Sequence, residues 1–291
     1  MTSIAGKKVL FCGNRSYVLD QILDSALSLV NILPIKGSYL ERHVIEKGLP
    51  HSSITTKQEL IQIINTTDFD IFISNGCPFI LPISNINKNN ERLFINIHPS
   101  VLPDLRGMDP VPGAILFNRD SGATCHLMED TIDTGDIISQ VRIKNNDDLD
   151  AALLYQMSFM AEQDVFTAAL KSDFSPAKKQ NIEKEHIYYS IHPDDKIIKF
   201  SESIKIISRR IRAFNTRNQG AYFIYNKKPY KVSNIRPLDN HYLKENLHAY
   251  RNNEIVLTYE NRFLLFRDNL FFEFSLYDYD ILIPQPGTIL E

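Results

Sequence analysis

The sequence predicts an α/β protein in which a Rossmann-like, doubly wound and mainly parallel sheet is followed by a smaller antiparallel β C-terminal domain. Over the first 170 residues, short apolar runs alternate with amphipathic stretches of helical spacing. These apolar runs lack polar alternation, which is typical of parallel strands that helices cover on both faces. After Gly220 the chain becomes rich in β-branched and aromatic residues, which favours antiparallel strands.

The first region contains apolar runs that predict strands and amphipathic stretches that predict the helices between them. The strands are expected at 7–13, 31–37, 69–76 and 92–99, and the helices at 20–30 and 55–65. Two further strands, at 122–128 and 136–143, flank the acidic loop "EDTIDTG", so they can pair as a hairpin. A long helix over 148–171, with N-cap acceptors in "NNDD", ends this region.

The second region follows a stretch from about 175 to 200 that is mainly polar, as linkers are. Residues 201–214 then have the spacing of one more amphipathic helix. Farther on, "NKK" and "EN" interrupt the aromatic runs and are typical hairpin tips. The predicted domains are a first domain at 1–178, a linker with a helix at 179–219, and the small β domain at 220–291.

The composition is that of an ordinary globular protein. Of the 291 residues, 43% are hydrophobic and 23% are charged, and the formal net charge is −3. No apolar stretch approaches the roughly 20 residues of a membrane helix, and "MTSIAGKKVLFCGN" enters a strand pattern, unlike a signal peptide. We therefore predict a cytoplasmic protein without a membrane partner. The slight negative charge also disfavours a nucleic-acid partner but leaves room for a small phosphate ligand.

The three cysteines, Cys12, Cys77 and Cys125, lie in or beside apolar runs and lack the spacing of metal ligands. We interpret them as reduced packing residues in the protein interior. The remaining histidines show no ligand spacing either, so the sequence predicts no metal site.

The stretch "FINIHPSVLPDLRG", residues 94–107, ends a hydrophobic strand on an amide and an imidazole. Residues two apart in a strand share a face, so Asn96 and His98 project side by side where the strand leaves the sheet. Ligands of open α/β sheets bind at the carboxyl ends of the strands. An amide there can stabilise an oxyanion, and an imidazole can move a proton near neutral pH. The alternative is a strand-end pair whose polar atoms are satisfied locally.

Prolines and an acidic loop complete the predicted cleft. The four prolines within residues 99–112 fix φ and lack a donor, so we expect a stiff loop that walls a cleft beside the two side chains. A carboxylate that orients the imidazole is expected at Asp133 in "EDTIDTGDI", where a solvated turn is the alternative. His126 ranks below His98 because it can simply pack or bond locally.

Together, "NIHPSVLPDLRGMDP" and "GATCHLMEDTIDTGDII" resemble the formyltransferases that use N10-formyltetrahydrofolate, through the Asn-x-His-Pro-Ser, Leu-Pro-x-x-Arg-Gly and Asp-x-Gly-Asp/Gln-Ile signatures of that family. The resemblance covers most of the first domain. It implies that Asn96, His98 and Asp133 are the catalytic triad. It also implies a cis bond between Leu102 and Pro103, a conformation that X–Pro bonds readily adopt.

The same resemblance implies a site for N10-formyltetrahydrofolate as co-substrate. In the family the pterin lies along a backbone segment corresponding to "SNGCPFIL" and against the loop that carries the acidic residue. The implied cofactor-binding residues are Ser74, Asn75, Gly76, Cys77, Pro78, Phe79, Ile80, Leu81, Leu127, Met128, Glu129, Asp130 and Ile132.

Three branches of the family differ in the amine that they formylate. Glycinamide ribonucleotide formyltransferases lack a second domain, and the methionyl-tRNA branch carries a basic surface, whereas this chain is slightly acidic. Residues 191–223 are similar to the branch that formylates nucleotide-linked deoxyamino sugars, and more loosely to the tRNA branch. The resemblance favours dTDP-4-amino-4,6-dideoxyglucose, then 3-amino sugars, in the synthesis of surface polysaccharide such as lipopolysaccharide O-antigen.

A sugar nucleotide requires a pyrophosphate site and a platform for its base. "CGNRSY" follows the first predicted strand, so its N–H groups and Arg15 can meet phosphate, unless the segment is a plain strand-to-helix turn. Arginine and aromatic residues elsewhere in the chain can supply positive charge for the phosphates and a stacking face for the base. The alternative is that these residues lie on the surface or in the core and bind no ligand. The predicted substrate-binding residues are Asn14, Arg15, Ser16, Ser100, Arg106, Gly107, Arg212, Phe214 and Tyr222.

Two other functions compete with formyl transfer to a sugar nucleotide. A catalytically silent nucleotide-binding module on this fold is disfavoured because all three triad positions are intact. A hydrolase that deformylates the folate is the second rival.

The aromatic C-terminal strands offer more apolar surface than a small sheet hides, which predicts a homodimer.

Overall fold

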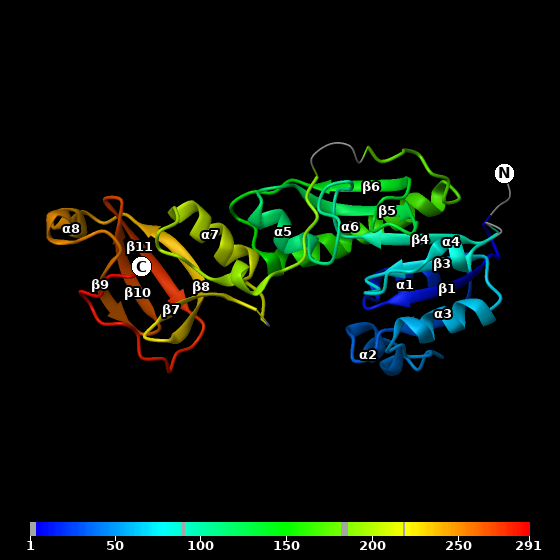
Figure 1. The fold of residues 1–291 in the computed structure, drawn as a ribbon, viewed down its shortest axis with the longest axis horizontal. Coiled ribbons are helices and arrows are strands. Elements are labelled where there is room, and N and C mark those ends of the chain that lie inside the picture. Colours follow the sequence, from blue (N-terminus) through cyan, green and yellow to red (C-terminus); the bar gives the residue numbers. More distant parts are fainter. Residues whose placement is uncertain (1–3, 89–90, 182–185, 218) are drawn as a thin grey trace. The chain divides into compact units, whose positions relative to one another are not determined.

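The computed structural model describes residues 4–88, 91–181, 186–217 and 219–291. Contacts between residues divide the chain into two units (Figure 1). The first unit comprises Met1–Val111, Asp120–Lys144 and Tyr155–Ser190, and the second comprises Pro112–Arg119, Asn145–Leu154 and Ile191–Glu291. The domain boundaries at 178 and 219 stay a prediction.

None of the described helices has the length and hydropathy that crossing a membrane requires.

The first unit is built on a six-stranded sheet with the order β2-β1-β3-β4-β5-β6 (Figure 1). Strands β1 to β4 are parallel, whereas β5 pairs antiparallel with both β4 and β6. The strands are β1 Lys8–Gly13, β2 Ser28–Pro34, β3 Ile71–Asn75, β4 Leu93–His98, β5 Ser121–Leu127 and β6 Ile137–Ile143. The predicted mainly parallel sheet and the hairpin formed by its last two strands are confirmed.

Apolar side chains of the parallel strands alternate between two buried clusters. Val9 and Phe11 of β1 belong to one cluster, and Leu10 and Cys12 belong to the other. Successive residues of a strand point to opposite faces, so an unbroken apolar run is buried only where both faces of the sheet are covered. The lack of polar alternation in this strand therefore has a direct structural cause.

The helices between and after these strands are α1 Tyr17–Leu23, α2 Tyr39–Glu46, α3 Lys57–Thr66, α4 Ile83–Ile86, α5 Pro110–Leu116 and α6 Ala151–Lys171. Apart from α5, each of them contributes side chains to the two buried clusters of the sheet. Helix α3 begins at a capping box in which the side chains of Thr56 and Glu59 accept from each other's backbone N–H groups. This reciprocal pair fixes the start of the helix, and the predicted helix at 55–65 is confirmed.

Two elements differ from the sequence prediction. Helix α1 ends at Leu23, and β2 begins at Ser28, within the range predicted as helix. The second half of the proline-rich stretch is not a loop, because Pro110 opens helix α5. Proline is tolerated there, since the N–H groups of a first helical turn have no partner within the helix.

The second unit contains a five-stranded sheet with the order β7-β8-β11-β10-β9, in which all neighbours are antiparallel. Its strands are β7 Ala221–Tyr225, β8 Lys228–Leu238, β9 Glu254–Tyr259, β10 Arg262–Arg267 and β11 Leu270–Leu276. Its helices are α7 Ile204–Ala213 and α8 His241–Lys244, with 3₁₀ turns at Pro193–Lys196 and Leu247–Ala249. The predicted hairpin tips and the antiparallel character of this region are confirmed.

Aromatic rings form the core of this second sheet. Phe263 of β10 and Phe274 of β11 are paired across the strands and stack with their centroids 4.9 Å apart and their planes at 6°. Phe200 and Phe223 pack around them, with centroids between 5.5 and 5.9 Å from neighbouring rings of this group. All four rings are buried. The aromatic richness of the C-terminal sequence thus reflects core packing.

The first sheet brings polar residues together at the carboxyl ends of its central strands. Register places Ser74 of β3 beside Asn96 of β4, and it pairs Asn96 with His126 of β5. Directly paired residues of antiparallel strands lie on the same face. An amide and an imidazole therefore meet at this end of the sheet, and His98 follows two residues later on that face.

We expect Phe274→Ala to lower the free energy of unfolding by about 3–5 kcal/mol, because it removes a fully buried ring from the stacked pair. Leu270→Ala, at a half-exposed position of the same strand, is the matched control and should cost less than about 1 kcal/mol. Urea unfolding followed by circular dichroism measures both. Equal costs for the two variants would contradict this account of the core.

Candidate active site

His98 is buried at the end of β4, and both of its ring nitrogens have defined neighbours. Its Nε2 lies 2.9 Å from the carbonyl oxygen of Leu105, and its Nδ1 lies 3.6 Å from Oδ2 of Asp133. A carbonyl can only accept, so Nε2 carries the hydrogen and Nδ1 of the neutral ring is free to accept a proton. The base nitrogen of His98 therefore faces a carboxylate.

The loop after β4 is held in an unusual path. The Leu102–Pro103 bond is cis, as the family resemblance predicted, and Leu105 has a positive φ of 57°. Thr124 of β5 donates to the carbonyl of Ser100 and accepts from the N–H of Leu102. These bonds tie the loop to β5, and the same loop presents the Leu105 carbonyl to His98.

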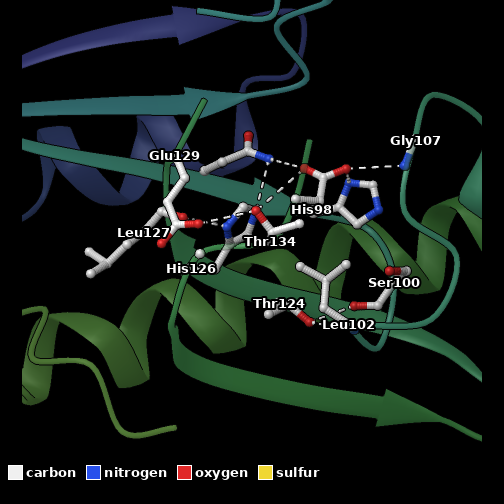
Figure 2. Close-up of polar contacts among 12 residues, drawn as sticks. His98, Ser100, Leu102, Gly107, Thr124, His126, Leu127, Glu129 and Thr134 are labelled. Carbon is white, nitrogen blue, oxygen red and sulfur yellow. Dashed lines mark hydrogen bonds and ion pairs between the residues drawn. The ribbon is translucent and has the colours of Figure 1, made fainter. Parts of the chain in front are cut away.

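The carboxylate of Asp133 accepts from two groups that come from different parts of the chain. Its Oδ1 lies 3.2 Å from Nδ2 of Asn96, and its Oδ2 lies 3.1 Å from the N–H of Gly107. Figure 2 shows His98 and His126 turned toward the carboxylate that receives the Gly107 N–H. The predicted convergence of Asn96, His98 and Asp133 at one place is confirmed by these distances.

The backbone around Asp133 is constrained as well. Asp133 has a φ of 55°, a left-handed conformation that is uncommon for residues other than glycine. Nε2 of Gln180 donates to the carbonyls of Asp133 and Gly135, at 3.0 and 2.7 Å. A Cβ on Gly135 would lie 2.0 Å from the Leu127 carbonyl oxygen, so only glycine fits this turn. Gln180 was not predicted as a site residue, because it lies in a polar stretch where no motif distinguishes it from its neighbours.

His126 contributes more than the sequence ranking gave it. Its Nδ1 lies 2.7 Å from the carbonyl of Leu127, so Nδ1 carries the hydrogen and Nε2 can accept. That Nε2 lies 3.2 Å from Nδ2 of Asn96. Both hydrogens of the Asn96 amide are therefore engaged, one by Asp133 and one by His126. The feature of the sequence that could have marked His126 as a site residue is its place on the strand that precedes the acidic loop.

Burial and neighbouring groups set the protonation states of His98 and Asp133. Burial lowers the pKa of His98 below its ordinary value of 6.5, and Asp133 and the Leu105 carbonyl only partly offset this effect. Burial opposes the ionisation of Asp133, but the charge that His98 carries at acid pH and the N–H of Gly107 hold the pKa of this carboxyl well below its usual range. At neutral pH the site therefore holds a neutral imidazole beside a carboxylate.

A cavity of about 260 Å³ opens on these residues. Asn96, His98 and Asp133 line it. The predicted cofactor-binding residues that line it are Ser74, Gly76, Cys77, Pro78, Phe79, Ile80, Leu81, Met128, Glu129 and Ile132, and the predicted substrate-binding residues that line it are Asn14, Arg15 and Gly107. Its wall thus combines apolar side chains with the polar groups at the strand ends.

Several predicted site residues lie elsewhere. Asn75 is fully buried, and the carboxylate of Asp130 accepts from the N–H of Ser84. Ser100 is a correction, because its buried hydroxyl donates to the carbonyl of Asp104 and so supports the proline-rich loop. Leu127, Ser16 and Arg106 are also absent from the residues that line this cavity.

The base platform predicted in the C-terminal region meets two structural obstacles. Phe214 is a correction, since its ring is fully buried in the second unit and offers no stacking face. Arg212 is engaged there by the carboxylate of Asp147 and the carbonyls of Asn146 and Leu149. Tyr222 is half-buried, and its role in binding stays a prediction.

The cysteines agree only in part with the interpretation made from the sequence. Cys12 and Cys125 are buried, but Cys77 is only partly buried and lines the cavity. Among the described residues, no group of three or more His, Cys, Asp and Glu side chains is arranged to hold a metal ion.

Fold and site together define an α/β protein with an amide, an imidazole and a carboxylate at a cavity beside the strand ends. Residues 38–170 match the family model for formyl transferase, and residues 190–267 match the model for the formyl transferase C-terminal domain. The methionyl-tRNA formyltransferase of Rickettsia typhi is 30% identical over 223 residues, which are 73% of this chain and 71% of that protein. The chain belongs to the formyl transferase family.

Three further curated methionyl-tRNA formyltransferases are matched over only 50% to 66% of their own length. Among solved structures, a 4-N formyltransferase from Francisella tularensis has a TM-score of 0.66 and 22% identity, covering 78% of this chain and 97% of that chain. An N-formyltransferase from Helicobacter canadensis, in complex with folinic acid and dTDP-3-aminofucose, has a TM-score of 0.67 and 19% identity. That match covers 94% of this chain and 100% of the other, and it shows a shared fold.

We expect His98 to titrate below pH 6.5, because burial favours its neutral form. The unfolded chain binds this proton at the ordinary pKa of 6.5, so the stability that depends on neutral His98 is complete above pH 6.5 and is lost as the pH falls from there through the lower pKa of the folded state. An NMR titration of the histidine Cε1–H signals measures the midpoint, and the signal that disappears in His98→Asn identifies the residue. A midpoint at or above 6.5 would contradict the assignment.

Proposed function

We propose that this protein transfers a formyl group from N10-formyltetrahydrofolate to the amine of a nucleotide-linked deoxyamino sugar. The observation that carries the proposal is the meeting of the Asn96 amide, the His98 imidazole and the Asp133 carboxylate at one cavity. This set can hold an oxyanion and move a proton, which are the two demands of acyl transfer to an amine.

In the proposed mechanism, the neutral sugar amine attacks the formyl carbon and a C–N bond forms. Nδ1 of His98 accepts a proton from the resulting ammonium and passes it to the departing folate nitrogen as the bond to the formyl carbon breaks. Asp133, 3.6 Å away, stabilises the imidazolium during this relay. The products are the N-formyl sugar and tetrahydrofolate, so the proton and the formyl group are both accounted for.

Asn96 holds the developing oxyanion in this proposal. Its amide gives one hydrogen to the Asp133 carboxylate and the other to Nε2 of His126. The carboxylate is the stronger acceptor, so the hydrogen directed at His126 is the one that the oxyanion takes. His126 thereby orients the amide before the reaction and gives up its bond as negative charge develops.

The cavity wall fits a folate co-substrate. A pterin is a flat ring with polar edges, and the wall offers the side chains of Phe79, Leu81 and Met128 beside the carboxylate of Glu129. The neighbour from Helicobacter canadensis was solved with folinic acid. We propose that the segments 74–81 and 127–132 hold the folate.

The likeness along nearly the whole chain to an N-formyltransferase that was solved with dTDP-3-aminofucose supports a sugar acceptor. The net charge of −3 also disfavours tRNA. We propose dTDP-4-amino-4,6-dideoxyglucose as the first acceptor to test and 3-amino sugars as the second, with surface polysaccharide as the destination. Methionyl-tRNA is the second candidate, because the curated relatives act on it by name.

A panel assay tests the proposal. The intact chain is incubated with N10-formyltetrahydrofolate and, separately, with nucleotide-linked amino sugars, methionyl-tRNA, or no amine, and the formyl products are quantified. We expect formylation of at least one sugar nucleotide. Transfer to methionyl-tRNA alone would move the protein to the second candidate, and release of formate without an amine would make it a hydrolase.

Mutation then tests the residue roles. We expect Asn96→Ala to lower turnover by about a hundredfold to a thousandfold and His98→Asn by about a hundredfold to ten-thousandfold, while both substrates still bind. His241→Asn, at a solvent-exposed position in the second unit, is the matched control and should keep normal turnover. Near-normal turnover in His98→Asn would remove His98 from the mechanism.

We also propose that the protein is a homodimer through its C-terminal region. Ile224, Tyr279 and Leu282 are 58%, 76% and 80% exposed, which is more apolar surface than a small sheet usually leaves in water. Light scattering at micromolar concentration is expected to give twice the mass of the chain, and Leu282→Glu should shift it toward the monomer. A wild-type monomer would contradict this assembly.

A further inference from the structure

Two of the three cysteines meet at the wall of the catalytic cavity. Cys12, near the end of β1, is fully buried in the apolar cluster that also contains Leu81. Cys77 is partly buried, packs against that cluster and lines the cavity. One thiol is therefore enclosed by the protein, whereas the other is reached from the cavity.

The backbone holds these two residues close to each other. Strands β1 and β3 are parallel neighbours, and Cys12 is in register with Ser74. Beyond the strand ends, the N–H of Asn14 donates to the carbonyl of Asn75 at 3.1 Å. A Cβ on Gly13 would lie 2.0 Å from that carbonyl oxygen, so only glycine allows the two segments to approach this closely. The turn after β3 is thus fixed against the end of β1.

The two thiols also contact each other directly. The S–H of Cys12 donates a hydrogen bond to the sulfur of Cys77, and the N–H of Phe79 donates to the same sulfur. The bond from Cys12 and, to a smaller extent, that from Phe79 lower the pKa of Cys77 below its ordinary value, although burial opposes them. The hydrogen bond to Cys77 and burial raise the pKa of Cys12. The sulfur at the cavity therefore ionises first, and the thiol behind it keeps its proton.

Cys125 differs from this pair in both respects. It is fully buried on β5, does not line the cavity, and has a pKa that burial raises. Thiolates react with peroxides, and redox-sensing cysteines are accessible, have a low pKa and lie beside a second thiol that can attack the oxidised sulfur. Cys77 meets all three conditions, whereas Cys125 is neither accessible nor acidic.

We infer that Cys77 is a site of reversible oxidation by hydrogen peroxide, that Cys12 converts the oxidised sulfur to a disulfide, and that this disulfide weakens folate binding. First, the Cys77 thiolate attacks peroxide and the O–O bond breaks, which gives a sulfenic acid and a hydroxide that takes up a proton. Second, the sulfur of Cys12 attacks the sulfenic acid, the S–O bond breaks, and the oxygen leaves with the thiol proton as water. The two thiols are oxidised by two electrons, which reduce one peroxide to two waters.

The effect on folate rests on the proposed function, in which the segment 74–81 holds the folate. A disulfide brings its sulfur atoms to about 2.05 Å, closer than two hydrogen-bonded thiols lie. Cys77 must therefore move toward Cys12 and draw the turn at Gly76 with it. That turn is already crowded, since a Cβ on Gly76 would lie 2.0 Å from Oδ1 of Asn14. The backbone that holds the folate is consequently displaced.

Peptide mapping of the intact protein tests the chemistry. The chain is treated with hydrogen peroxide, alkylated and digested without reductant, and the peptides are identified by mass spectrometry. We expect a pair of peptides joined through Cys12 and Cys77, which dithiothreitol separates. Folinic acid added before the peroxide should slow this linkage, because it covers Cys77. In Cys12→Ala the sulfenic acid persists, so dimedone should label Cys77.

Folate binding tests the consequence. Calorimetry gives the Kd for folinic acid before and after oxidation, and dithiothreitol should reverse any change. We expect the oxidised wild type to bind about tenfold more weakly, which corresponds to one or two lost hydrogen bonds with the displaced backbone. Cys125→Ala keeps both thiols of the pair, so it is the matched control and should respond as the wild type does. In Cys77→Ser the Kd should be the same before and after peroxide.

Absence of the Cys12–Cys77 linkage after peroxide treatment would overturn the inference and leave the proposed function standing. An unchanged Kd for folinic acid in the linked protein would overturn it as well. Failure of the reduced wild type to bind folinic acid and to formylate any amine would instead overturn the proposed function, and with it the effect on folate.

Discussion

The carboxylate of Asp133, whose side chain is only 10% exposed, is the constraint on which the site depends. Removing a carboxylate from water is costly unless its oxygens are well supplied with donors. Here Asn96 from β4 and the Gly107 N–H from the proline-rich loop supply them, and both histidines lie nearby. Because one side chain needs all of these partners, the strand end, the loop after it and the acidic loop are fixed relative to one another.

The same arrangement gives His98 two properties that rarely coexist. Burial keeps the ring neutral at pH 7, so it can accept a proton, and the carboxylate 3.6 Å away then stabilises the charged ring. At about 4 Å and an effective dielectric constant of 20, two unit charges attract by about 4 kcal/mol. The carbonyl of Leu105 selects the tautomer, because it accepts from Nε2–H of His98 and so leaves Nδ1 as the basic nitrogen.

Two acidic side chains organise the polar groups of the first unit. Asp133 orients the groups of the catalytic cavity, and Glu162, which is fully buried, accepts from the guanidinium of Arg15 at 3.0 and 2.7 Å. Glu162 comes from α6, and the loop after β1 supplies Arg15, so residues 147 positions apart in the chain form one pair. Gly76 allows the backbone after β3 to pass close to that pair.

The sequence by itself determined the fold class and the three residues that meet at the strand end. Apolar runs, helical spacing and the aromatic C-terminal segments act locally, and the spacing of Asn96 and His98 fixes their common face in any strand. The pairing of His126 with Asn96, the Gln180 bonds and the Arg15–Glu162 pair were decided only by the tertiary structure. So was the burial of Ser100 and Phe214. These features depend on which distant segments pack together, and spacing along the chain carries no record of a contact between side chains far apart in sequence.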